Sequence, residues 1–114
     1  MSQETKTYIN IRISEDMKKR VARALEWEGI DQSTLILSYV YQFVQMVEAG
    51  DRPDPQKLTY AEQDRNRTKF IQVRVNPKLK QRLKQALNET NLSETTLVLS
   101  YLVCFVLESE KKHL

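Results

Sequence analysis

The stretch YINIRISEDMKKRVARALEWEGIDQSTLILSYVYQFV, residues 8–44, occurs a second time in altered form in this chain of 114 residues. The second copy, KFIQVRVNPKLKQRLKQALNETNLSETTLVLSYLVCFV, covers residues 69–106, and adding 62 to a first-copy number gives its counterpart without gaps. Identical residues recur throughout, at Ile9/Ile71, Arg12/Arg74, Lys18/Lys80, Arg20/Arg82 and Leu37-Ser38-Tyr39/Leu99-Ser100-Tyr101. Chance does not produce such a match, so the chain contains a duplicated unit of about forty residues.

Each copy begins with a short run in which apolar and polar side chains alternate. The apolar positions are Ile9, Ile11 and Ile13 in the first copy, and Ile71, Val73 and Val75 in the second. A period of two predicts a strand with one buried face. Because a lone strand leaves its backbone groups unpaired on both edges, we expect the two strands to pair with each other as an antiparallel ribbon.

Two helices are expected after each strand. The first covers roughly residues 15–27 and 77–89, and the second is apolar on most sides, which is typical of a buried helix. Residues with the chemistry of helix caps precede each of the four helices, at Ser14, Asp31, Asn76 and Ser93. Gly29 and Asn91 stand where the first helix of each copy should end.

The domain organisation follows from the repeat. The copies span residues 7–48 and 69–110, and residues 49–68 between them form a linker with Gly50, Pro53 and Pro55. We expect Leu58 and Tyr60 to dock on the core, with a short helix over 58–64. A unit of about forty residues seldom folds alone, so the copies must pack on each other or on copies from another chain. The predicted fold is mainly α with a two-stranded antiparallel ribbon.

Composition excludes several functional classes. The chain has one Cys, one His and two Gly, too few for a structural zinc site or a glycine-rich phosphate loop, and we expect no metal or cofactor. No His lies where it could activate Cys104, so an enzyme is the least favoured class. Neither a transmembrane stretch nor a signal peptide is expected, and the lone Cys favours a reducing cytoplasm.

The positive charge is concentrated in two segments. Residues 5–25 carry a net charge of +4, and residues 65–87 carry a net charge of +8. Because the whole chain has a net charge of +3, the remaining residues together carry −9. Such asymmetry indicates a surface that faces a polyanion, although two solvated helix faces would give the same pattern.

The polar face of the predicted ribbon carries side chains of the types that can read DNA bases. A two-stranded ribbon fits the major groove, where Arg bonds guanine and Asn or Gln bonds adenine in a bidentate manner. The candidate base readers are Asn10, Arg12, Gln72 and Arg74. Tyr8 and Phe70 share this face, where they would either touch thymine methyl groups and the sugar-phosphate backbone or close the end of the core. The alternative for the four candidate base readers is that they are merely solvated outward residues of a small sheet.

A strand and two helices per copy, with a basic polar ribbon, resemble the ribbon-helix-helix DNA-binding family of the Arc, MetJ and CopG type. The resemblance covers both copies and implies two fused repeats that form an intertwined pseudo-dimer. It also implies that Tyr8, Asn10 and Arg12, with Phe70, Gln72 and Arg74, enter the major groove.

The resemblance further implies that the start of each second helix binds a backbone phosphate. The residues concerned are Gln32, Ser33 and Thr34 in the first copy and Thr95 and Thr96 in the second. Nearby basic residues would add phosphate contacts, at Lys6, Lys18, Lys69 and Lys80. Asp31 and Glu94 place carboxylates near the same helix starts, where capping and the helix dipole account for them.

The function expected from these observations is sequence-specific binding of double-stranded DNA as a transcriptional repressor, in the cytoplasm and on the nucleoid. Pseudo-dimers could associate with one another on tandem sites. An accessory factor for plasmid or phage DNA processing fits the same features. An antitoxin or another protein-binding module is the alternative from a different class.

Overall fold

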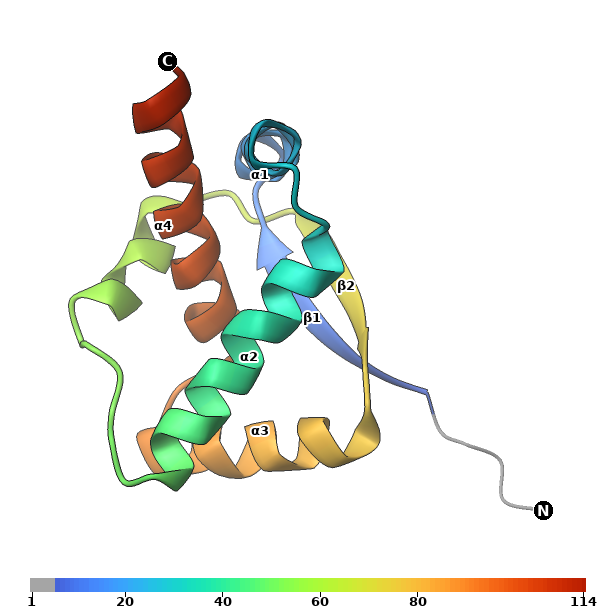
Figure 1. Ribbon diagram of the computed structural model, residues 1–114, viewed down its shortest axis with the longest axis vertical. Helices are drawn as coiled ribbons and strands as arrows, with labels where there is room; N and C mark the ends of the chain where they lie inside the picture. The colour runs from blue at the N-terminus through green and yellow to red at the C-terminus, as the bar shows by residue number, and fades with distance from the viewer. Residues whose placement is uncertain (1–5) are drawn as a thin grey trace.

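The computed structural model describes residues 6–114 and is mainly helical, with a two-stranded antiparallel sheet (Figure 1). The predicted absence of a signal peptide concerns the N-terminal residues, of which 1–5 lie outside this description. The elements follow in the order β1 (Thr7–Ile13), α1 (Glu15–Glu28), α2 (Gln32–Glu48), the 3-10 helix η1 (Lys57–Gln63), β2 (Lys69–Val75), α3 (Pro77–Thr90) and α4 (Glu94–His113).

The two strands pair with each other in antiparallel register from Thr7 opposite Val75 to Ile13 opposite Lys69. The alternation of apolar and polar residues along each strand decides which face of the ribbon is buried. All six apolar side chains, Ile9, Ile11, Ile13, Ile71, Val73 and Val75, point into the core and are at most 4% exposed. The predicted ribbon and its buried face are confirmed.

The predicted caps delimit the four α-helices. The side chains of Ser14, Asp31, Asn76 and Ser93 each accept a hydrogen bond from a backbone N–H in the first turn of the helix that follows. Gly29 and Asn91 adopt the left-handed conformation at the ends of α1 and α3, with φ of 67° and 56°. These local signals fix where each helix begins and where α1 and α3 turn into the second helix.

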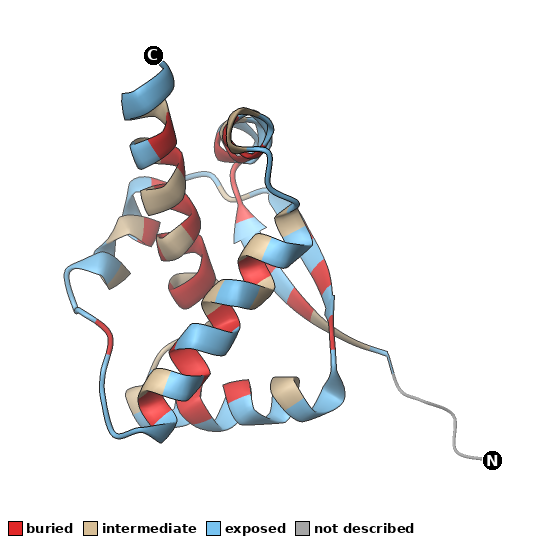
Figure 2. Ribbon diagram, in the orientation of Figure 1, coloured by how far each residue is buried: buried red, intermediate tan, exposed pale blue. Residues whose placement is uncertain are grey.

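The helices pack across the repeats rather than within them. α1 lies against α4, and α3 lies against α2 (Figure 1). The second helices supply much of the core, and the buried residues of α2 and α4 follow the helix sides turned towards the interior (Figure 2). Fully buried positions of α4 include Leu97, Val98, Leu99, Leu102, Val103 and Val106.

The linker is folded onto one side of the molecule, where η1 packs against α4 (Figure 1). The Ser100 hydroxyl donates to the carbonyl of Leu58 and accepts from the amide of Ala61, both at 3.0 Å. Leu58 and Tyr60 are half-buried against the core, as predicted. The predicted short helix is present as a 3-10 helix, one residue earlier at each end.

The end of the linker is fastened to the start of α1. The carboxylate of Asp64 is buried and accepts from the backbone amide of Ser14 at 2.9 Å and from its hydroxyl. Arg67 donates from Nε to the carbonyl of Asp64 at 2.9 Å. Asn76 is the counterpart of Ser14 in the second repeat, and no such attachment is found there within residues 6–114. The linker therefore makes the start of the first helix different in the two repeats.

No helix within residues 6–114 is by itself both long and apolar enough to cross a membrane. Taken together, α3 and α4 reach that length and apolarity, but the two helices meet at a bend of 93°.

Candidate nucleic-acid interface

The six predicted base readers share the outer face of the ribbon. Pleating places their side chains opposite the buried face. The register pairs Tyr8 with Arg74, Asn10 with Gln72, and Arg12 with Phe70. Asn10, Arg12, Phe70, Gln72 and Arg74 are exposed, and Tyr8 is half-buried. The ribbon thus brings together side chains that are about sixty residues apart in sequence.

The centre of this face is an amide pair. Gln72 donates from Nε2 to Oδ1 of Asn10 at 3.1 Å. Both side chains are exposed, so each retains further donor and acceptor capacity towards a ligand lying on the ribbon.

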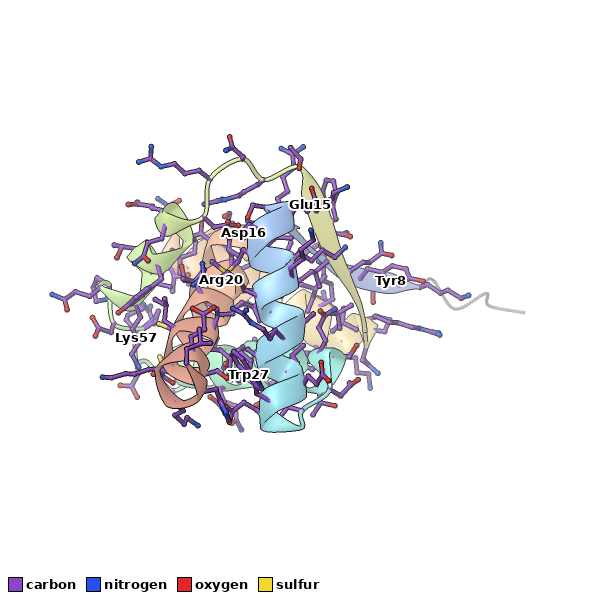
Figure 3. All side chains as sticks on the ribbon, turned by 90° about the horizontal axis from the view of Figure 1, so that it is seen from above. Tyr8, Glu15, Asp16, Arg20, Trp27 and Lys57 are labelled. Atoms are coloured by element: carbon purple, nitrogen blue, oxygen red, sulfur yellow. The ribbon has the colours of Figure 1, made fainter. Side chains whose placement is uncertain are left out.

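The Arg side chains lie on either side of the amide pair. The guanidinium of Arg12 is 5.4 Å from the ring centroid of Phe70, its cross-strand neighbour, a distance suited to a cation–π contact. Phe70 is 52% exposed on the outer face, so it does not close the core. Tyr8 lies at the other end of the ribbon, near the start of β1 (Figure 3).

A lysine from each first helix binds the outer edge of the opposite strand. Lys18 donates from Nζ to the carbonyl of Phe70 at 3.0 Å, and Lys80 donates from Nζ to the carbonyl of Tyr8 at 2.8 Å. These bonds hold two ammonium groups beside the ribbon. Lys6 and Lys69 are exposed and flank its opposite ends, since Lys6 precedes β1 and Lys69 pairs with the last residue of β1.

The start of α4 is fastened to the free edge of β1. Glu94 accepts from the backbone amide of Asn10 at 3.2 Å, and the Thr95 hydroxyl accepts from that of Arg12 at 3.4 Å. Thr95 and Thr96 are half-buried, and the amide of Thr96 donates to the cap residue Ser93 at 3.0 Å. Two of the predicted phosphate binders therefore already contribute to internal hydrogen bonds.

The start of α2 is more open. Gln32 is half-buried, while Ser33 and Thr34 are exposed. The cap residue Asp31 accepts from the amide of Thr34 at 3.1 Å and from its hydroxyl at 3.2 Å. The first amides of a helix have no partner within the helix, so this turn offers donors at the surface.

Glu94 is the residue whose position the sequence did not predict. Capping and the helix dipole account for a carboxylate at the start of a helix, but this one reaches across to the ribbon. One signal in the sequence could have pointed to Glu94. The repeat places the uncharged Gln32 at the corresponding position of the first copy, so the carboxylate is a difference between the two copies.

The described residues hold little that suggests other chemistry. Within residues 6–114, no three His, Cys, Asp or Glu side chains are arranged to hold a metal ion. Cys104 is half-buried, and burial raises the pKa of its thiol, which disfavours the thiolate that a nucleophile needs.

Comparison of the chain with protein-family models, curated proteins and solved structures finds no match.

Proposed function

We propose that this chain is a fused ribbon-helix-helix protein that binds double-stranded DNA by inserting the outer face of its ribbon into the major groove. Its two repeats act as the halves of a pseudo-dimer, and the protein serves as a sequence-specific transcriptional repressor in the cytoplasm, on the nucleoid. The observation that carries the proposal is the exposed row of Asn, Gln and Arg side chains on a two-stranded ribbon.

The strand register supports a two-fold relationship between the repeats. Asn10 pairs with Gln72, and Gln72 is also the residue that corresponds to Asn10 in the second repeat, 62 positions later. The counterpart of Tyr8 is Phe70, and the counterpart of Arg12 is Arg74. The pair of Tyr8 with Arg74 therefore corresponds to the pair of Phe70 with Arg12 on the other side of the amide pair. This register is the one expected for a two-fold axis through the amide pair, and it supports the proposed pseudo-dimer.

Two ion pairs between helices obey the same relationship. Arg20 of α1 binds Glu110 of α4 through Nε and Nη2 at 2.8 and 2.6 Å. Arg82 of α3 binds Glu48 of α2 through the same atoms at 2.9 and 2.6 Å. Arg82 corresponds to Arg20, and Glu110 corresponds to Glu48, each at a distance of 62 positions. In both repeats the first helix is therefore paired with the second helix of the other repeat. Figure 3 shows Arg20 on α1.

The chemistry of the outer face favours duplex DNA as the ligand. Guanidinium groups match O6 and N7 of guanine, and carboxamides match N6 and N7 of adenine, in the groove that admits a ribbon. Lys6, Lys18 and Lys69 add exposed positive charge around the ribbon, where phosphates would pass. The two halves differ at Asn10 against Gln72, so the preferred site need not be a perfect palindrome.

Selection of binding sites from a random duplex library tests this proposal. The parent protein is compared with an Arg12→Ala/Arg74→Ala variant and with a control, Lys84→Ala/Lys111→Ala, which removes the same charge from exposed positions on α3 and α4. We expect a defined site with the parent and the control, and a weak or altered site with the Arg variant. Absence of enrichment with the parent near physiological salt would exclude sequence-specific DNA binding.

A further inference from the structure

We propose that the two ends of the ribbon contact the DNA backbone unequally, and that Glu94 sets the difference. This inference rests on the proposed function, because it concerns how the same surface meets a duplex. It assigns the stronger backbone contact to the end of the ribbon at Lys18 and the weaker one to the end at Lys80.

Glu94 closes the Lys80 end through both of its carboxylate oxygens. Oε1 accepts from Nζ of Lys80 at 2.5 Å, and Oε2 accepts from the amide of Asn10 at 3.2 Å. The side chains of Lys80 and Glu94 are only 17% and 20% exposed. The charge of Lys80 is thus neutralised within a partly buried cluster on the edge of β1.

The Lys18 end lacks this carboxylate. Lys18 is exposed and donates to the carbonyl of Phe70 at 3.0 Å, and within residues 6–114 it forms no ion pair. The position that corresponds to Glu94 is Gln32, which carries no charge. Asp31 supplies a carboxylate at this helix start, but it is turned onto the amide and hydroxyl of Thr34.

A phosphate group therefore meets different surfaces at the two ends. It reaches the Lys18 ammonium directly, whereas at the other end it must displace Glu94 before it can pair with Lys80. Binding of a phosphate by a free cation releases a condensed counterion, and a cation that is already paired contributes less to this effect. The contacts to the DNA backbone should therefore be stronger on one flank of the bound site.

The matched variants Glu94→Gln and Gln32→Glu test the inference, because each gives one repeat the residue of the other. Glu26→Gln, at an exposed position late in α1, is the control for net charge. Binding to a labelled random-sequence duplex is followed by fluorescence anisotropy over a series of salt concentrations. We expect Glu94→Gln to steepen the salt dependence by about 0.9 and to tighten binding about threefold to tenfold at low salt. Gln32→Glu should shift both quantities in the opposite direction.

Phosphate ethylation interference on the site selected by the parent provides a second readout. We expect contacts mainly on one flank with the parent, and additional contacts on the other flank with Glu94→Gln. If Glu94→Gln matches Glu26→Gln in salt dependence and gains no contact, the inference is wrong while DNA binding stands. If the parent binds no duplex, both the inference and the proposed function fail. Should Glu94→Gln fold poorly in a thermal unfolding measurement, Gln32→Glu alone decides, because an unchanged salt dependence in that variant would overturn the inference.

Discussion

Gln72 donates a hydrogen bond to Asn10, its counterpart in the other repeat, at 3.1 Å across the centre of the ribbon. Both side chains are exposed, so the bond exchanges freely with hydrogen bonds to water and contributes at most about 1 kcal/mol to stability. The two carboxamides can therefore turn towards a ligand lying on the ribbon at little cost. The site that these residues form is held in shape by the strands and not by its own side-chain contacts.

The central amide pair should affect recognition more than stability. We expect Asn10→Ala and Gln72→Ala each to change the free energy of unfolding by less than about 0.5 kcal/mol, as at other exposed positions. Each should lose about 1–3 kcal/mol of discrimination at the central base pairs of a selected site. Urea unfolding and competition binding with centrally substituted duplexes measure the two effects. Unchanged discrimination in both variants would show that the amides do not read bases.

Removal of the two edge lysines should have unequal effects on DNA binding. We expect Lys18→Ala to reduce the slope of log affinity against log salt by about 0.9, because a free phosphate contact is lost. Lys80→Ala should reduce it less, since Lys80 is already paired with Glu94. Lys84→Ala, on the exposed side of α3, serves as the control in the same titration. Equal slopes for the two edge variants would contradict the unequal arrangement.

The two equivalent Arg–Glu pairs should differ in their contribution to stability. The side chains of Arg20 and Glu110 are 29% and 14% exposed, whereas those of Arg82 and Glu48 are 42% and 48% exposed. We expect Arg20→Ala to lower the free energy of unfolding by about 1–2 kcal/mol, because Glu110 is left with fewer partners. Arg82→Ala should have a smaller effect, since water replaces the lost partner. Chemical denaturation at neutral pH measures both; a larger loss for Arg82→Ala would be inconsistent with this burial.

Stability should fall in acid as these carboxylates are protonated. The hydrogen bond from Arg20 lowers the pKa of Glu110 below its ordinary value, and the hydrogen bond from Arg82 does the same for the pKa of Glu48. An acid whose pKa is lower in the folded state stabilises the protein above the unfolded pKa of about 4.3, and this contribution is lost as the pH falls through the folded pKa.

Urea unfolding at a series of pH values tests this dependence. We expect the free energy of unfolding of the parent to decline below about pH 4.3. The free energy of unfolding of Glu110→Gln should decline less steeply, because one of the two carboxylates with a lowered pKa is absent. An identical decline in both proteins would remove Glu110 from the explanation.

The buried carboxylate of the linker should be needed for stability. Asp64→Ala leaves the amide and hydroxyl of Ser14 without their partner in a buried position, which we expect to cost about 1–3 kcal/mol. Asp54→Ala, at an exposed position of the same linker, is the control. Thermal unfolding and limited proteolysis of the linker measure the effect. Resistance to proteolysis equal to that of the parent would show that Asp64 does not fasten the linker.

Much of the fold could be predicted from local patterns. The alternation over Thr7–Ile13 and Lys69–Val75 determines which side chains are buried, because successive residues of a strand point to opposite faces. Ser14 and Asn76 determine where α1 and α3 begin, because a cap side chain accepts from an amide only two or three residues further along the chain. The repeat added the expectation that the strands pair with each other.

The sequence by itself thus determined the strands and helices, where each α-helix begins, where α1 and α3 end, and the row of polar side chains on the ribbon. Only the tertiary structure decided how these elements meet: the Glu94–Lys80 cluster on the edge of β1, the packing of α1 on α4, and the attachment of Asp64 to Ser14. Periodicity and capping act over a few residues, so they can be read along the chain. Contacts such as that between Glu94 and the amide of Asn10 join residues 84 apart, and they depend on the path of the whole backbone and not on any local pattern.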